Sequence, residues 1–248
     1  MHILLTNDDG INASGLSALA ASLRDIGRVS IVAPDRERSA VSHALTLHHP
    51  LRAMMLAADV FAVDGTPTDC VNLGIHSLLT DKPDIVISGI NHGANLGDDI
   101  TYSGTVSAAM EATLMGIPSF AVSLATESGS PDFTSAALFA ANLAKTVLRQ
   151  GLPRDTFLNV NIPDISFEAL KSPRITRQGK RRYEGMIVDK VDPRGRNYYW
   201  IGSVDMQFHD TEGTDYHAVS RGHISITPLH LDLTNYKSLR ELKTWEFS

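Results

Sequence analysis

The chain opens with Met1-His2-Ile3-Leu4-Leu5-Thr6-Asn7-Asp8-Asp9-Gly10, an apolar run that ends in two adjacent carboxylates. Residues 1–5 are typical of a buried strand. Because successive strand side chains point to opposite faces, Asp8 and Asp9 share one site only if the chain turns, and Gly10 permits that turn. Buried carboxylates are costly unless a cation neutralises them. The stretch therefore predicts a hard divalent cation at the carboxyl edge of a sheet. The alternative is a loop in which an Asp caps the next helix.

The composition is that of an ordinary globular protein. The chain has 248 residues, of which 43% are hydrophobic and 20% charged, which favours one large domain. No apolar run reaches the roughly 20 residues of a membrane helix, and the N-terminus lacks a secretory signal pattern. A net charge of −6 argues against nucleic-acid binding, and a single cysteine, Cys70, fits a reducing compartment. We expect a cytoplasmic protein that binds neither membranes nor nucleic acid.

Strand-like and helix-like segments alternate along the first 165 residues. Apolar runs predict strands at 2–7, 29–34, 60–63, 83–89, 118–123 and 157–162. Helical spacing predicts helices at 13–26, 104–115 and 133–148, and Thr66 with Pro67 marks another helix start. This alternation is typical of βαβ units. It predicts an α/β fold: a Rossmann-like, mostly parallel sheet with helices on both faces.

The pattern changes after about residue 165. Residues 171–230 lack helical periodicity and read as β-rich segments, and residues 235–247 read as a terminal helix. We therefore predict a single domain over residues 1–248, with a core at about 1–165 and an extension and tail at about 166–248. The tail carries an apolar stripe that must be buried on its own domain or on a neighbour; its members are Tyr236, Leu239, Leu242 and Trp245, with Phe247 beyond them.

Three polar segments follow predicted strands. They are Asp8 with Asp9, residues 35–42 including Ser39, and residues 88–99 including Asn91 and Asn95. Because βαβ connections return the chain to the same end of the sheet, we expect all three at one edge. The asparagines add neutral oxygens suited to a cation or a ribose, although both could equally serve the turn. The glycine spacing at 89, 93 and 97 fits neither a dinucleotide fingerprint nor a P-loop.

A fourth segment, Ser103-Gly104-Thr105, lies at the start of a predicted helix. Free N–H groups and the helix dipole make such a start an anion site. We predict that these residues cradle a phosphate, with Asn95 lining the same pocket. The alternative is an ordinary Ser N-cap.

Other polar clusters carry less weight. His43, His48 and His49 match no metal-binding spacing, and the lone Cys70 is interpreted as a small buried hydrophobe. A basic run is interpreted as a solvated face, with contact to an anionic substrate as the alternative; it comprises Arg177, Lys180, Arg181 and Arg182.

Taken together, these motifs closely resemble those of the SurE (survival protein E) family, metal-dependent 5'/3'-nucleotidases. The matching stretches span nearly the whole chain in order. They are residues 4–10, 33–39, 64–71, 88–99, 102–106, 192–195, 199–202, 213–215 and 225–229. One departure is His92-Gly93-Ala94, where the family has Ala-Gly-Pro or a close variant, which affects the rim of the site and not its expected ligands.

The resemblance implies a cytoplasmic hydrolase that removes phosphate from nucleoside monophosphates, with some members also acting on short polyphosphate. It implies one divalent metal cation per subunit held by Asp8, Asp9, Ser39 and Asn91. It further implies a Rossmann-like core with a β-rich extension, and a swapped C-terminal segment that builds a homodimer or homotetramer.

The chemistry of these residues agrees with the resemblance. Two carboxylates, a hydroxyl and an amide oxygen suit Mg²⁺ or Mn²⁺. Asp8 and Asp9 are the candidate catalytic residues, and either could orient or deprotonate the water. In a second enzyme hypothesis Asp8 is a covalent phosphoryl acceptor, but the position that would then carry an acid/base Asp is Gly10. A non-enzyme hypothesis is a metal- and nucleotide-binding sensor without turnover.

Overall fold

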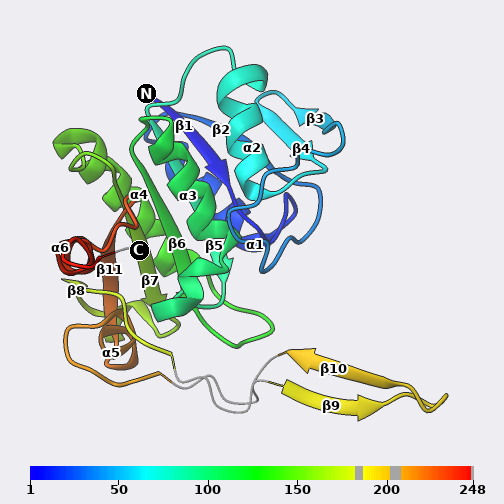
Figure 1. Cartoon of the computed structure of the whole chain (residues 1–248). Helices are drawn as coiled ribbons and strands as arrows, with labels where there is room; N and C mark the ends of the chain where they lie inside the picture. The colour runs from blue at the N-terminus through cyan, green and yellow to red at the C-terminus, as the bar shows by residue number, and fades with distance from the viewer. Residues whose placement is uncertain (182–186, 202–207, 247–248) are drawn as a thin grey trace.

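The computed structural model describes residues 1–181, 187–201 and 208–246. Its centre is a nine-stranded sheet in the order β3-β4-β2-β1-β5-β6-β7-β11-β8 (Figure 1). The strands from β4 to β7 in this order pair in parallel, whereas β3 and β11 pair antiparallel with β4 and β7. The predicted α/β class, a Rossmann-like and mostly parallel sheet, is confirmed.

The elements follow the predicted alternation. The strands of the sheet are β1 (His2–Thr6), β2 (Arg28–Pro34), β3 (Ala53–Ala57), β4 (Val60–Val63), β5 (Ile85–His92), β6 (Ser119–Ala125), β7 (Thr156–Pro163), β8 (Lys171–Ile175) and β11 (His223–His230). The α-helices are α1 (Ser14–Leu23), α2 (Pro67–Leu73), α3 (Gly104–Leu114), α4 (Thr134–Gln150), α5 (Asp215–Ser220) and α6 (Tyr236–Leu242). Short non-α helices are η1 (Gly74–Leu78), η2 (Gly97–Thr101) and η3 (Phe167–Ala169).

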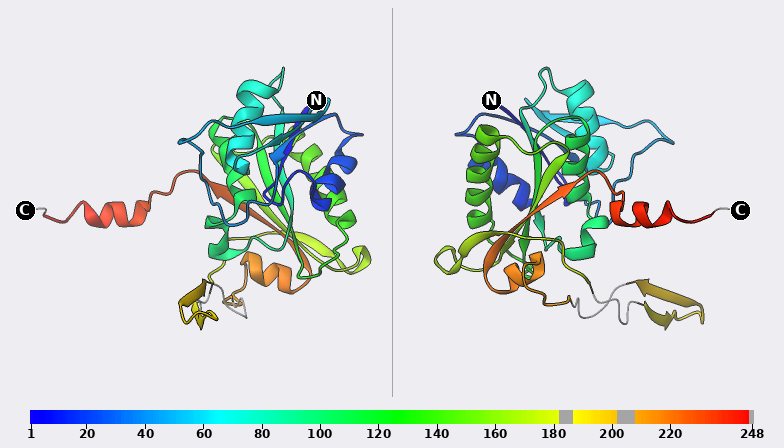
Figure 2. Two further views of the ribbon diagram at one scale, coloured as in Figure 1. Left: turned by 90° about the vertical axis from the view of Figure 1, so that its right-hand side faces the viewer. Right: turned by 60° about the vertical axis from the view of Figure 1, so that its left-hand side comes forward.

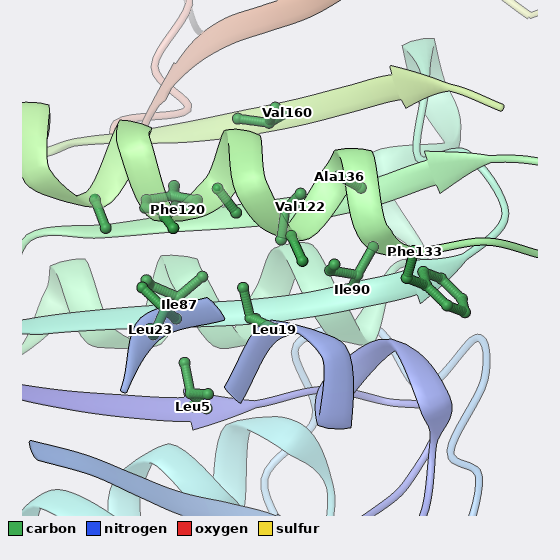
Figure 3. Close-up of a cluster of buried hydrophobic side chains, with 14 of the residues drawn as sticks. Leu5, Leu19, Leu23, Ile87, Ile90, Phe120, Val122, Phe133, Ala136 and Val160 are labelled. Carbon is green, nitrogen blue, oxygen red and sulfur yellow. The ribbon is translucent and has the colours of Figure 1, made fainter. Parts of the chain in front are cut away.

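Two helix layers cover the sheet because its buried strands are apolar on both faces. On one face, α1 and α4 pack on alternate residues of β1, β5 and β6, including Leu5, Ile87 and Phe120 (Figure 3). On the opposite face, α2 and α3 pack on the residues between them, such as Leu4 and Val86. The core therefore lies on both sides of the parallel strands.

The strand order fixes where a ligand site can form. From β1 the chain passes to β2 on one side, and later to β5 on the other. The crevice at the carboxyl ends of β1 and β5 is thus a topological switch point, the usual ligand position in open α/β sheets.

Beyond residue 165 the structure contains an α-helix that the sequence did not predict. Helix α5 lies within the stretch that was expected to be β-rich. It has six residues, too few for a helical period to show in the sequence. Strands β8 and β11 join the main sheet, whereas β9 (Ile187–Val191) and β10 (Asn197–Ile201) form a separate two-stranded sheet (Figure 1).

The predicted terminal helix is present as α6, which projects away from the sheet (Figure 2). Phe247, assigned to the same apolar tail, lies outside the described residues. Among the residues that are described, no helix is long and apolar enough to cross a membrane.

The start of α2 generates a stability prediction. The Thr66 hydroxyl accepts from the Asp69 N–H, and the Asp69 carboxylate accepts from the N–H groups of Thr66 and Thr46 and from the Thr46 hydroxyl. Asp69→Ala leaves these donors unpaired at a site only 2% exposed, so the free energy of unfolding should fall by about 2 kcal/mol or more in urea titrations. The exposed Asp25→Ala control should stay within about 0.5 kcal/mol of the wild type. Equal values for the two variants would contradict this account.

Candidate active site

A cavity of about 950 Å³ opens at the switch point between β1 and β5. Its lining draws on the loops after β1, β2 and β5, as the sequence predicted. The predicted site residues that line it are Asp8, Asp9, Ser39, Asn91, Asn95 and Ser103.

Asp8 is the most buried carboxylate of the cavity, with only 5% of its surface exposed. The Thr105 N–H donates to Asp8 Oδ2 at 3.2 Å, and the Thr105 hydroxyl donates to Asp8 Oδ1. Helix α3 can approach this closely because residue 104 is a glycine: a Cβ there would lie 3.0 Å from Asp8 Cβ. Burial nevertheless raises the pKa of Asp8 above its ordinary value.

Asp9, the next residue, also lines the cavity and contacts the end of β5. Its Oδ2 accepts from the His92 N–H at 3.0 Å, and burial raises the pKa of Asp9 to about 6. The hydrogen-bond donors to Asp8 and Asp9 are thus backbone N–H groups and a hydroxyl. Two desolvated carboxylates with such partners are suited to a cation that would hold both in the ionised form.

Asn91 lines the same cavity as the two carboxylates. Its Nδ2 donates to the Gly93 carbonyl at 2.8 Å, which fixes the orientation of the amide. Asn91 Oδ1 then lies 3.5 Å from Thr105 Oγ1, the hydroxyl that binds Asp8. The Asn91 amide oxygen and the Asp8 carboxylate therefore both lie within reach of the Thr105 hydroxyl.

Ser39 reaches the cavity from the loop after β2. Its hydroxyl donates to Glu37 Oε1 at 2.6 Å, so its lone pairs stay available to a ligand. The Arg38 N–H donates to the Asp8 carbonyl at 2.7 Å, which ties this loop to the end of β1. Gly10, at φ +97°, allows the approach, because a Cβ there would lie 2.9 Å from the carbonyl carbon of Arg36.

These four residues present two carboxylates, a hydroxyl and an amide oxygen to one cavity. This is an all-oxygen donor set, and it fits a hard cation such as Mg²⁺ or Mn²⁺ better than a soft one. The donor chemistry of the residues present is thus compatible with the metal that the sequence led us to expect.

The predicted phosphate residues divide into two groups. Ser103 and Asn95 lie on the cavity wall, whereas Gly104 and Thr105 lie behind Asp8 and are absent from the lining. The Ser103 hydroxyl accepts from the Val106 N–H at 3.1 Å, as an N-cap does. Phosphate binding by this helix start remains a prediction.

Two residues were undervalued by the sequence reasoning. Arg181, from the basic run, lines the cavity, and its Nη1 donates to Asp99 Oδ1 at 2.5 Å. His43 is absent from the cavity lining, but its Nε2 lies 2.6 Å from Oε2 of Glu111 on α3, a contact that no motif indicated. In the sequence, only its membership of the basic run indicated that Arg181 could contact a ligand. Arg182 lies outside the described residues.

Fold and cavity together define a doubly wound α/β protein with a carboxylate-rich ligand site at its switch point. The model of the family described as "Survival protein SurE" matches residues 3–185. A protein from Geotalea uraniireducens named 5'-nucleotidase SurE is 70% identical over 248 residues, covering 100% of both chains. One from Geotalea daltonii with the same name is 69% identical over 246 residues, covering 99% of each.

A solved structure agrees with these sequence matches. The crystal structure of SurE protein from Aquifex aeolicus superposes with a TM-score of 0.89 at 48% identity, covering 98% of each chain. The chain therefore belongs to the SurE family, which confirms the resemblance drawn from its motifs.

The site generates a prediction about metal binding alone. Asp8→Asn removes a charged oxygen from the cavity, so its affinity for Mn²⁺ measured by titration calorimetry should fall by at least about tenfold. The exposed Asp132→Asn variant is the control and should bind Mn²⁺ as the wild type does. Unchanged affinity in Asp8→Asn would move the metal site elsewhere.

Proposed function

We propose that the chain is a 5'-nucleotidase, a phosphoric monoester hydrolase that converts nucleoside monophosphates to nucleoside and phosphate. The observation that carries the proposal is the switch-point cavity, in which Asp8 and Asp9 are desolvated beside the oxygens of Ser39 and Asn91. The relatives at 70% and 69% identity are named 5'-nucleotidase SurE, which points to the same activity. Hydrolysis is favoured over a sensor without turnover on these grounds.

Our assignment for the metal ligands is Asp8, Asp9, Ser39 and Asn91, which would hold one Mg²⁺ or Mn²⁺ per subunit. When bound, a divalent cation neutralises charge on the transferring phosphoryl group and lowers the pKa of water. The Asn91 amide donates to the Gly93 carbonyl and the Ser39 hydroxyl donates to Glu37, so oxygen lone pairs of both side chains stay available to the cation.

The two carboxylates differ in what else they bind. Both oxygens of Asp8 accept hydrogen bonds from Thr105, whereas Asp9 accepts from His92 through Oδ2. We assign Asp9 to orienting the attacking water and receiving its proton, since Asp8 is committed to α3. For the phosphate we assign Ser103 and Asn95 on the wall, with the N-terminal dipole of α3 at Gly104 and Thr105 behind them.

The C-terminal region is assigned to assembly into a homodimer or homotetramer. Leu233, Tyr236 and Trp245 are 88%, 56% and 63% exposed. Large apolar side chains gathered on an exposed tail indicate a surface that is covered by another protein chain.

We also propose that residues 1–248 form one domain with an extension and tail from about 166. A single buried cysteine, Cys70, supports the assignment to the cytoplasm.

Phosphate release tests the proposed activity. The protein incubated with Mn²⁺ and a nucleoside monophosphate should release phosphate, a chelator should abolish release, and added Mg²⁺ or Mn²⁺ should restore it. Asp9→Asn should lower kcat by at least about a hundredfold, because a charged group at the reacting centre is lost. Asp25→Asn, an exposed exchange of the same kind, should have wild-type kinetics.

Two outcomes would contradict the proposal. Binding of the nucleotide without phosphate release would leave the sensor hypothesis. Full turnover after exhaustive metal removal would exclude metal-dependent hydrolysis.

Deletion of residues 232–248 tests the assembly role. The tail contributes no residue to the cavity lining among the described residues, so Mn²⁺ affinity should be unchanged while self-association weakens. Light scattering at low protein concentration measures the mass, with the full chain as the reference. An unchanged oligomeric mass would mean that the tail packs on its own subunit.

A further inference from the structure

Two asparagines occupy the middle of β7, where buried strands normally carry apolar residues. Asn159 and Asn161 are both 0% exposed. Two positions apart, they point to the same face of the sheet, the one covered by α3. Burying two amides here is unfavourable unless each is hydrogen-bonded, so their partners should reveal their purpose.

Both asparagines bind the backbone of a single residue, Asn95. Asn161 Oδ1 accepts from the Asn95 N–H at 2.8 Å, and Asn161 Nδ2 donates to the Asn95 carbonyl at 2.9 Å. Asn159 Nδ2 donates to the same carbonyl at 2.8 Å. Asn95 is thereby held through both of its main-chain polar groups, in a loop with no strand of its own to pair them.

The side chain of Asn95 is held as well. Its Nδ2 lies 2.8 Å from Oγ of Ser123, which is the direct register partner of Asn161 between β6 and β7. Asn95 lies on the cavity wall, whereas Asn159, Asn161 and Ser123 are absent from the lining. These three side chains therefore reach the cavity through Asn95.

We propose that Asn159 and Asn161 are positioning residues for the nucleotidase reaction, acting through Asn95, which contacts the bound nucleotide. This inference rests on the proposed function. Rigid placement of a contact residue matters because a misplacement of about 1 Å can cost about a hundredfold in rate. The metal ligands are held separately: Asn91 by Gly93, and Asp8 by Thr105. The two asparagines should thus affect the nucleotide and leave the metal alone.

The first test compares Asn161→Ala and Asn159→Ala with Asn142→Ala, an exposed asparagine on α4. At a temperature where all three are folded, kcat/KM for a nucleoside monophosphate should fall about tenfold or more in the two β7 variants and not in the control. Mn²⁺ affinity should stay within about threefold of the wild type in all of them. A loss of stability with unchanged kinetics in the folded protein would reduce the pair to a structural role and overturn the proposal.

A double-mutant cycle tests the route through Asn95. If Asn161 acts through the Asn95 side chain, Asn161→Ala in an Asn95→Ala background should change kcat/KM by less than about threefold. Additive losses would show that Asn161 acts elsewhere and would overturn the proposal. If Asn161→Ala does not fold, Ser123→Ala takes its place in the cycle, because it removes only the contact between Ser123 and the Asn95 side chain. Its effect on kcat/KM should likewise be less than about threefold in the Asn95→Ala background.

A binding arm separates this inference from the proposed function. The probe is a nucleoside methylenephosphonate, which cannot be hydrolysed, titrated by calorimetry in the presence of Mn²⁺. If the wild type binds it but releases no phosphate from the monophosphate, the proposed activity fails, while weaker binding by Asn161→Ala still supports the positioning role. Equal dissociation constants for wild type and variant, or no binding by the wild type, would overturn the inference.

Discussion

The bond between Asp8 and Thr105 is the contact on which the site depends. It joins the end of β1 to the first turn of α3, two elements that lie far apart along the chain. A carboxylate desolvated to this degree needs donors aimed at it, and a helix N-terminus supplies both N–H groups and a favourable dipole. Gly104 is the steric condition for the contact, because a larger residue would meet Asp8 itself. This bond therefore fixes the position of the Asp8 carboxylate relative to the start of α3.

The strand order gives that contact its setting. With β2 and β5 on opposite sides of β1, the loops that follow these three strands diverge above the sheet and leave a crevice. Asp8 and Asp9 directly follow β1 and Asn91 lies at the end of β5, so two walls of the cavity are built on paired strands. Ser39 lies on a longer loop and is exposed, held near Asp8 by the Arg38 N–H. Asp8, Asp9 and Asn91 are thus placed by strands of the sheet, whereas Ser39 is placed by a loop.

Asp8 and Asp9 could be predicted as a cation site because they follow a strand whose apolar run is plain in the sequence, whereas Ser39 and Asn91 entered the ligand set through the family resemblance. Their convergence then follows from the handedness of βαβ units. Helix α5 could not be predicted, since its six residues are too short for a periodic signal. A helix start looks the same in the sequence whether its donors serve a phosphate or a neighbouring carboxylate, so the contact of the Thr105 hydroxyl with Asp8 could not be predicted. Only the tertiary contact with Asp8 shows where its hydroxyl is used.

Asn159 and Asn161 show most clearly where sequence reasoning stops. In Phe157-Leu158-Asn159-Val160-Asn161-Ile162, polar residues alternate with apolar ones, the ordinary pattern of a strand with one face in water. Here both faces are buried, and the two asparagine side chains bind the backbone of Asn95 in the place of water. A loop that must hold a fixed shape at a ligand site cannot obtain its hydrogen bonds from a neighbouring strand, so buried side chains have to supply them. The core beneath the cavity is therefore less apolar than stability alone would favour, and that departure is what connects the packing of the sheet to the geometry of the site.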